Sequence, residues 1–195
     1  IEAGKRGRSV LVIDHAKAAG EKIRISGGGR CNFTNLGASP NNFISANPRF
    51  ARGPLRRYRP RDFIDLVDRY GIAWHEKTLG QLFCDDSAKD IIAMLLAEMK
   101  AARVQLRLAT AVAKVTRTAT GFELALPGGV VSCASLVVAT GGKSIPKMGA
   151  TGWGYEIAAQ FGLPMVETRP ALVPLTFEVG ALERRTPLAG VAVDA

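Results

Sequence analysis

A chain of 195 residues, 47% of them hydrophobic, is long enough to bury a sizeable core, and we expect a globular fold of one or two domains. No apolar run approaches the roughly 20 residues that a membrane-spanning helix needs. The three cysteines include no C-x-x-C pair and favour neither a disulfide framework nor a metal site, so a reducing cytoplasm is the expected location. The net charge of +9 leaves nucleic acid, an anionic surface or an anionic small molecule open as partners.

The first stretch of the chain predicts one strand of a parallel sheet. Residues Ile1 to Gly7 resemble the last two turns of a helix that ends at a glycine, so we expect the chain to be a fragment. Ser9 to Asp14 (SVLVID) is a near-continuous apolar run, typical of a strand buried on both faces. Asp14 at its carboxyl end is a candidate ribose ligand, although an aspartate there is also a common turn residue. The G-x-G-x-x-G turn that would come about 20 residues earlier is absent from this sequence.

The stretch KIRISGGGRCNFTN, from Lys22 to Asn35, predicts a ligand-binding loop. Three consecutive glycines allow positive φ and let a ligand approach the backbone amides, whereas the bland alternative is a simple glycine-rich turn. Basic and amide side chains add donors suited to a diphosphate. Cys31 has no second cysteine five positions later, where Leu36 stands, so a packed side chain is favoured over a redox thiol. The candidate ligands in this loop are Lys22, Gly27, Gly28, Gly29, Arg30, Cys31, Asn32, Thr34 and Asn35.

Two helices are predicted after an irregular connection from Leu36 to Pro60. The first begins at Pro60 and ends at Gly71, with apolar residues at helical spacing. The second runs from Ser87 to Ala102 and is predicted to place Ile91, Ile92, Leu95, Leu96 and Met99 on one face.

An arginine-rich cluster lies across the end of that connection. Its members are Arg49, Arg52, Arg56, Arg57, Arg59 and Arg61, with Phe50 and Tyr58 between them. Interleaved basic and aromatic residues are typical of single-stranded nucleic acid binding. A solvated face is the favoured interpretation, because no recognised nucleic-acid module accompanies the cluster, and guidance of an anionic substrate is a third.

From Val104 to Val138 the pattern changes to short strands, which predict a return to the parallel sheet followed by a small antiparallel excursion. Leu136 to Ala139 is predicted as another buried strand, and TGGKS follows it directly. This is not an NTPase phosphate loop, because Val137 stands where that motif needs glycine and Pro146 obstructs the following helix. Thr140, Gly141, Gly142 and Gly152 are instead candidates for backbone close to a cofactor. A short helix is predicted from Thr151 to Phe161.

Taken together, SVLVID, the glycine loop and SLVVATGGKSIPKMGATGWGYEIA (Ser135 to Ala158) resemble the bacterial FAD-dependent flavoproteins called BaiN-like or aminoacetone-oxidase-like. The resemblance implies an α/β, Rossmann-like FAD-binding domain over residues 1–170, without its first glycine turn, and the start of an inserted β-rich domain over residues 171–195. It also implies that the backbone at Val112 meets adenine.

The activity that this resemblance implies is hydride transfer between an organic small-molecule substrate and bound FAD. No catalytic residue is identified, no membrane partner is expected, and nucleic acid is the less favoured partner. The oligomeric state stays open. The alternative is a polyanion- or nucleic-acid-binding protein that uses the segment from Arg49 to Arg61.

Overall fold

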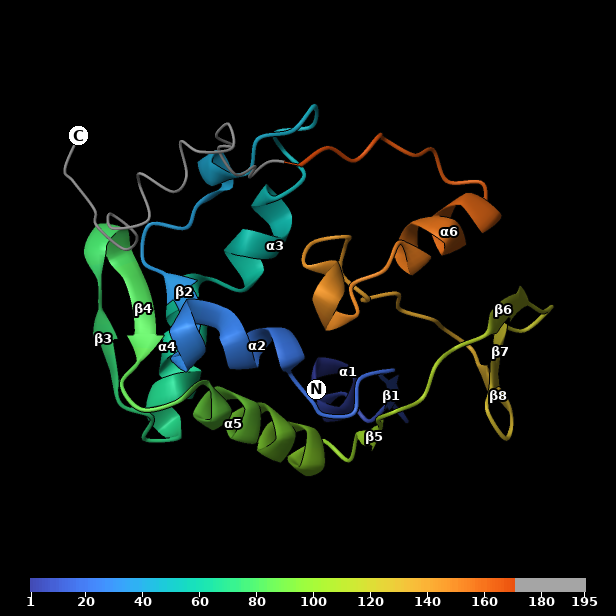
Figure 1. Cartoon of the computed structure of the whole chain (residues 1–195), viewed down its shortest axis with the longest axis horizontal. Helices are drawn as coiled ribbons and strands as arrows, with labels where there is room; N and C mark the ends of the chain where they lie inside the picture. Colours follow the sequence, from blue (N-terminus) through green and yellow to red (C-terminus); the bar gives the residue numbers. More distant parts are fainter. Residues whose placement is uncertain (171–195) are drawn as a thin grey trace, which may run out of the picture. The chain divides into compact units, whose positions relative to one another are not determined.

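The computed structural model describes residues 1–170, and its parallel strands are β1 (Leu11–Ile13) and β5 (Gln105–Arg107). They pair with Leu11 opposite Gln105 and Ile13 opposite Arg107 (Figure 1). Parallel neighbours need a long crossover, which residues 14–104 supply. The predicted α/β fold with a parallel sheet is therefore confirmed, although both strands are shorter than their apolar runs. Residues 171–195, where the inserted β-rich domain is expected, lie outside the described residues.

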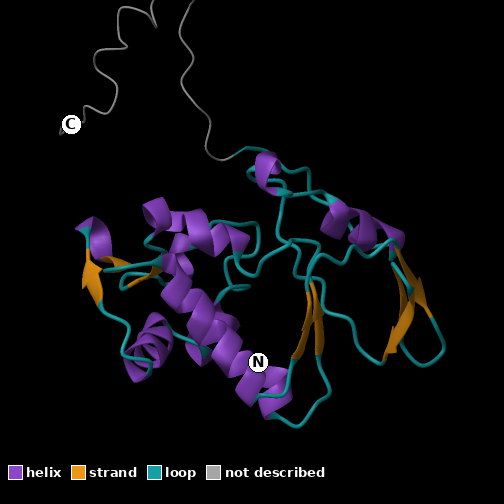
Figure 2. Ribbon diagram, turned by 60° about the horizontal axis from the view of Figure 1, so that its bottom comes forward, coloured by secondary structure: helices purple, strands orange, loops and turns teal. Residues whose placement is uncertain are grey.

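The crossover contains an antiparallel sheet that the sequence pattern did not predict. Its strands, in spatial order, are β2 (Asn32–Asn35), β4 (Gln81–Cys84) and β3 (Trp74–Glu76). Figure 2 shows the strands of the described residues in three separate groups, and this sheet is one of them. Strand β2 begins directly after the glycine loop, so pairing with β4 fixes where that loop ends. The strands are too short, at three or four residues, to give a clear alternating pattern.

Short helices fill the rest of the first part of the chain. They are α1 (Glu2–Lys5), α2 (Glu21–Ile25), α3 (Arg52–Arg57) and the 3₁₀ turns Ser26–Gly29, Pro40–Asn42 and Thr78–Gly80. The connection predicted as irregular from Leu36 to Pro60 thus contains one helix and one 3₁₀ turn. A glycine and a proline inside α3 hid it from a propensity argument.

The two predicted longer helices are confirmed as α4 (Pro60–Arg69) and α5 (Ala88–Ala101). Pro60 occupies the first turn of α4, and the backbone N–H of Arg59 donates to Asp62 Oδ2 at 2.7 Å. Ser87 caps α5, because its Oγ accepts from the Lys89 backbone at 3.1 Å. The buried face of α5 differs from the prediction at two positions: Met94 is buried although it was not predicted to be, and Leu96 is 38% exposed.

The core lies between α4, α5 and the residues that leave the glycine loop. Its buried members are Cys31, Leu66, Val67, Cys84, Ala88, Ile91 and Met94. Phe33 packs against this core with its ring centroid 6.0 Å from that of Phe63 and 6.3 Å from that of Trp74. A loop next to a close-packed core is held in one conformation, because interiors tolerate little change in volume.

The predicted antiparallel excursion is confirmed as β6 (Lys114–Arg117), β7 (Phe122–Leu126) and β8 (Gly129–Cys133). The predicted buried strand from Leu136 to Ala139 is wrong. These residues form no strand in the part of the chain that the structure describes, and the Val137 side chain is 84% exposed. An apolar run becomes a buried strand only where the backbone of another segment pairs with it. The local pattern cannot predict whether such a partner segment is present.

The chain divides into two compact units, Ile1–Gly154 and Tyr155–Ala195. The last elements of the described residues are a 3₁₀ turn at Pro146–Met148 and α6 (Trp153–Gln160), which confirms the predicted short helix. Helix α6 ends at Gln160, and the N–H of Gly162 in the following turn donates to the Ala159 carbonyl at 2.9 Å. None of the helices in residues 1–170 has the length and apolar character to cross a membrane.

Candidate dinucleotide-binding site

The glycine loop has left-handed backbone at each of its three glycines. The φ angles are 59° at Gly27, 67° at Gly28 and 88° at Gly29. A Cβ on Gly27 would lie 2.5 Å from Cε1 of Phe83, so glycine is required there for packing as well as for φ. A Cβ on Gly28 would meet no atom within 4 Å. The loop therefore packs closely against Phe83 at Gly27, whereas Gly28 is open to an incoming ligand.

Cys31 anchors the far end of this loop in the core. Its side chain is 4% exposed, and its N–H donates to the Ser26 carbonyl at 2.9 Å. The Cys84 N–H donates to the Arg30 carbonyl at 2.9 Å, which ties the loop to β4. Burial raises the pKa of the Cys31 thiol, against a smaller opposing effect of its hydrogen bond with Ser26. A buried, protonated thiol agrees with the interpretation of Cys31 as a packed side chain.

Lys22 connects α2 to the second glycine-containing motif, TGGKS. Its Nζ donates to Ser144 Oγ at 2.9 Å and to the Ser144 carbonyl at 3.1 Å, across 122 positions of sequence. Gly141 has a φ of 71°, and a Cβ on Gly154 would lie 2.8 Å from Thr140 Oγ1. The structure thus brings the TGGKS backbone, with Gly142, beside the helix that leads into the glycine loop.

Asp14 lies where the parallel strands end. Its N–H donates to the Arg107 carbonyl and its Oδ1 accepts from the Ala16 N–H, both at 2.9 Å. The carboxylate therefore stabilises a turn, as expected of an ordinary turn residue, while 42% of the side chain stays exposed. The Thr110 N–H donates to the Asp14 carbonyl at 3.0 Å, which places half-buried Val112 two residues beyond this contact. Asp14 and Val112 therefore share the carboxyl edge of the sheet, where such folds bind ligands.

Of the three polar candidates on β2, Asn32, Thr34 and Asn35, the two asparagines have side-chain partners within the protein. The Asn35 Nδ2 donates to the Leu79 carbonyl at 2.8 Å, and its Oδ1 accepts from the Gly37 N–H at 2.7 Å. The Asn32 amide, oriented to satisfy its nitrogen, donates to the Thr34 carbonyl at 3.0 Å. These bonds stabilise the turn after β2 and the strand itself. Gly152, the last candidate, is half-buried just before α6.

Sequence reasoning missed three residues that shape this site. Phe83 closes one side of Gly27, Ser144 receives Lys22, and His15 lies where a Cβ on Gly149 would approach its Nε2 at 2.9 Å. Each contact joins segments far apart in the chain, so no local pattern could have revealed it. A weak signal existed only for Ser144, because it lies in the glycine-containing motif.

The two histidines gave no signal for catalysis in the sequence, yet each lies near an aspartate, and His15 Nδ1 is 3.9 Å from Asp14 Oδ1. His75 Nδ1 lies 2.6 Å from Asp85 Oδ1, and the His75 ring stacks on Phe83 with centroids 6.2 Å apart. The side chains of this pair are 38% and 44% exposed. Among residues 1–170 no group of three or more His, Cys, Asp or Glu side chains is placed to hold a metal ion.

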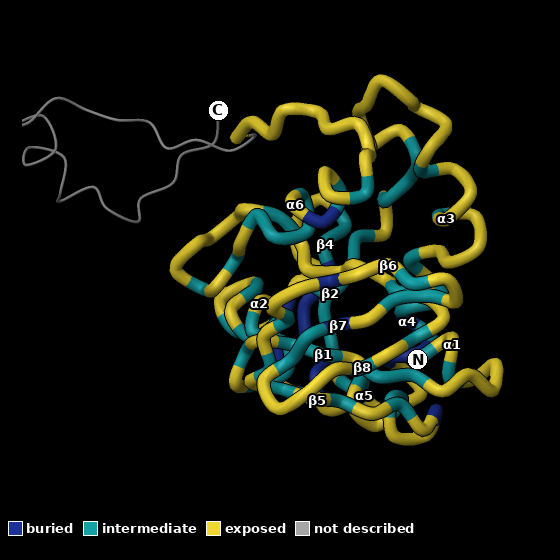
Figure 3. Tube along the Cα trace, turned by 90° about the vertical axis from the view of Figure 1, so that its right-hand side faces the viewer, coloured by how far each residue is buried: buried dark blue, intermediate teal, exposed yellow. Residues whose placement is uncertain are grey.

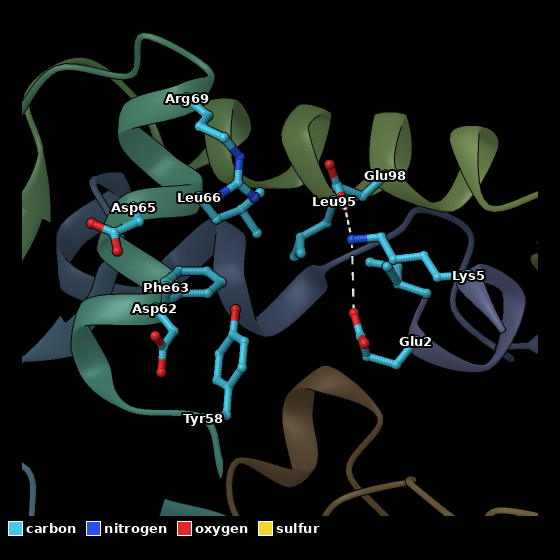
Figure 4. Close-up of a pocket in the computed structure, with 11 residues that line it drawn as sticks. Glu2, Lys5, Tyr58, Asp62, Phe63, Asp65, Leu66, Arg69, Leu95 and Glu98 are labelled. Carbon is cyan, nitrogen blue, oxygen red and sulfur yellow. Dashed lines mark ion pairs between the residues drawn. The ribbon is translucent and has the colours of Figure 1, made fainter. Parts of the chain in front are cut away.

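A cavity of about 390 Å³ lies away from the glycine loop, between α1, α4 and α5 (Figure 4). Lys5 pairs there with Glu98, and the Tyr70 hydroxyl donates to Glu98 Oε1 at 3.0 Å. The hydrogen bond from Lys5 is the main cause that lowers the Glu98 pKa. Asp62 and Asp65 at the cavity face arginines of their own, 3.1 and 2.8 Å away. These charges form a structural network that ties α1 to α5.

The parallel pair, the glycine loop after the first strand and the acid at that strand's end define a Rossmann domain of the dinucleotide-binding type. The chain belongs to the family described as HI0933-like protein Rossmann domain, whose model matches residues 1–194.

Curated relatives of this chain are named as enzymes. It is 54% identical over 191 residues to the ribosomal RNA dihydrouridine synthase of Escherichia coli, covering 98% of this chain and 48% of that protein. It is 45% identical over 180 residues to the protein of the same name in Haemophilus influenzae, covering 90% and 45%. A 3-dehydro-bile acid delta(4,6)-reductase of Clostridium scindens is 26% identical over 187 residues, covering 95% and 45%. The chain thus spans about half the length of the curated relatives it matches.

Proposed function

We propose that this chain carries the dinucleotide-binding part of a flavin-dependent reductase that converts uridine in ribosomal RNA to dihydrouridine. The observation that carries the proposal is 54% identity, over nearly the whole chain, to a protein named for that reaction. A second relative with the same name, at 45% identity, supports it from another organism. Because one fold hosts many reactions, the site itself must also suit a flavin dinucleotide.

The site fits FAD in three respects. Open space over Gly28 and left-handed backbone from Gly27 to Gly29 allow a diphosphate to approach the loop closely. The exposed side chains of Lys22 and Arg30 add positive charge beside it. Asp14 at the carboxyl edge suits a ribose hydroxyl, and the Val112 backbone suits adenine. We assign the cofactor contacts to Asp14, Lys22, Gly27, Gly28, Gly29, Arg30, Val112, Thr140, Gly141, Gly142 and Gly152.

Dihydrouridine formation adds a hydride and a proton across the C5–C6 double bond of the uracil ring. A bound flavin supplies the hydride chemistry. The chain's own residues hold and orient it: the glycine loop is fixed by Cys31 in the core, and Lys22 keeps TGGKS beside α2 through Ser144. The name of the distant relative, a delta(4,6)-reductase, supports reduction of a carbon–carbon double bond as the direction of the chemistry.

The test is nucleoside mass spectrometry of ribosomal RNA incubated with the natural full-length protein that contains residues 1–195. With FAD and a reduced nicotinamide present, we expect dihydrouridine to appear in rRNA from cells that lack the gene, and omission of the reductant should prevent it. Flavin-loaded protein that leaves every uridine unchanged would contradict the proposed reaction. Protein that binds rRNA but takes up no flavin would favour the competing class, a polyanion-binding protein.

A further inference from the structure

The excess positive charge of this protein lies in one contiguous stretch. The chain has 26 basic and 17 acidic residues, and residues 22–61 contain nine of the basic residues and none of the acidic ones. The remaining residues therefore carry 17 charges of each sign and are neutral overall. A solvated face normally intersperses both signs, so a run of 40 residues without one carboxylate needs another explanation.

Seven of these nine basic residues form no ion pair with a carboxylate of the described residues. Lys22, Arg24 and Arg30 lie in or near the glycine loop, and the other four lie on and just before α3. Arg59 and Arg61 are paired, with nitrogens 3.1 and 2.8 Å from the carboxylates of Asp62 and Asp65. Among the residues that the structure describes, no carboxylate forms an ion pair with Arg49, Arg52, Arg56 or Arg57, and all four are exposed. Arg52 and Arg56 lie one helical turn apart and so share a face of α3.

Exposed aromatic rings accompany these arginines. Phe50 is 78% exposed and Phe43 is 52% exposed, in a segment where every residue from 41 to 50 is exposed (Figure 3). The described part of the chain has four exposed aromatic residues, Phe43, Phe50, Tyr58 and Tyr70. Exposing an aromatic ring to water costs free energy, which the flat face of a nucleic-acid base can offset.

We propose that the arginine surface, formed by Phe43, Arg49, Phe50, Arg52, Arg56 and Arg57, binds unpaired ribosomal RNA. The inference rests on the proposed function for the identity of the RNA, and on charge and exposed rings for the surface. Unpaired RNA offers both phosphates for the guanidinium groups and splayed bases for the rings, whereas a duplex hides its bases. The same chain segment leads out of the glycine loop, so the substrate-binding surface and the cofactor loop are joined by β2.

The test compares two triple variants of the natural full-length protein that remove the same charge. Arg52→Ala/Arg56→Ala/Arg57→Ala alters the arginine surface, and Arg8→Ala/Arg103→Ala/Arg117→Ala removes three exposed arginines elsewhere. Binding of a labelled single-stranded oligouridylate is measured by fluorescence anisotropy over a series of salt concentrations. We expect the first variant to bind at least about tenfold more weakly and to lower the salt slope by about two, since each lost phosphate contact on a single strand contributes roughly 0.7.

A second pair of variants separates base stacking from charge. Phe50→Leu keeps an apolar side chain without the ring and should weaken oligouridylate binding about tenfold, whereas Phe50→Trp should retain it. Neither change should alter binding of heparin, which has charge but no bases. Retained FAD and an unchanged melting temperature in every variant show that the fold is intact.

The outcomes separate this proposal from the proposed function. Equal loss in both triple variants, or no loss in either, would overturn the arginine surface even if the wild-type protein makes dihydrouridine. Preference for a duplex over the single strand would overturn it too. If the wild-type protein forms no dihydrouridine but the arginine variant alone loses RNA binding, the surface stands and the proposed reaction falls.

Discussion

The glycine loop and the arginine surface are close in sequence but differ in packing, exposure and charge. The loop from Gly27 to Cys31 is fixed by left-handed backbone, by Phe83 against Gly27 and by Cys31 in the core. The arginine surface is exposed and carries charge of one sign. The difference agrees with the two proposals, in which a preorganised loop binds FAD and an exposed surface binds a flexible polyanion.

The largest expected effect is on the packed side of the loop. Gly27→Val would place atoms inside the Phe83 ring and force a β-branched residue to positive φ. We expect the free energy of unfolding to fall by about 3 kcal/mol, measured by chemical denaturation. A change below about 0.5 kcal/mol would show that the loop is not pressed against β4.

The open side of the loop should respond in binding rather than in stability. Gly28→Val and Gly7→Val both put valine at a left-handed φ, 67° and 75°, with nothing within 4 Å. Both should lose similar stability, but only Gly28→Val should weaken FAD binding, by about tenfold or more, equivalent to about 1.4 kcal/mol. Equal FAD affinity in the two variants, measured by flavin fluorescence, would remove Gly28 from the site.

The anchoring of the loop should depend on pH through Cys84. Burial, with a smaller contribution from Cys31, raises the pKa of the Cys84 thiol from 9.0 to about 11. The unfolded chain therefore releases this proton before the folded one does, so the stabilisation is complete below pH 9 and is lost as pH rises from 9 towards 11. Denaturation over this range should show a shallower pH dependence in Cys84→Ala than in the wild type.

The bridge between α2 and TGGKS should make a smaller contribution. Lys22→Ala removes two hydrogen bonds, and Ser144→Ala removes the one to the hydroxyl. Because the lysine is exposed, we expect a loss of about 1 kcal/mol or less of FAD binding for Lys22→Ala, and less for Ser144→Ala. Isothermal titration with FAD measures both, and a larger loss in Ser144→Ala would contradict this order.

The smallest effect on stability should come from the arginine surface. Arg52→Ala/Arg56→Ala/Arg57→Ala removes exposed, unneutralised charge, so the free energy of unfolding should change by no more than about 0.5 kcal/mol. Thermal denaturation at low salt is the most sensitive check, because like-charge repulsion is strongest there. If the free energy of unfolding falls by several kcal/mol, these arginines support the fold, and the proposed difference from the glycine loop is wrong.

Local sequence pattern was sufficient where one element determines its own structure. Pro60 and Ser87 mark where α4 and α5 begin, and alternation with turn glycines marks β6 to β8. It was insufficient where structure depends on a distant partner. Strands β2, β3 and β4 are held by pairing across up to 51 positions of sequence. The run Leu136 to Ala139 resembles a strand but has no paired neighbour among the described residues.

The candidate site divides in the same way. Gly27 and Gly28 were recognisable because three consecutive glycines have few other uses, but the sequence could not tell which of them faces the protein and which faces a ligand. That distinction depends on Phe83, 56 positions further along the chain. Asn35 was a candidate because it lies in the loop, and only the structure shows that its amide is used by Leu79 and Gly37.

The most direct test of the central claim, that the glycine loop forms a flavin dinucleotide site, is to identify what the natural full-length protein releases on denaturation. We expect purified protein to show a flavin absorption spectrum and to release FAD, and the Gly28→Val variant to release much less than Gly7→Val. A colourless protein that also takes up no added FAD would contradict the claim and would assign the loop to another ligand.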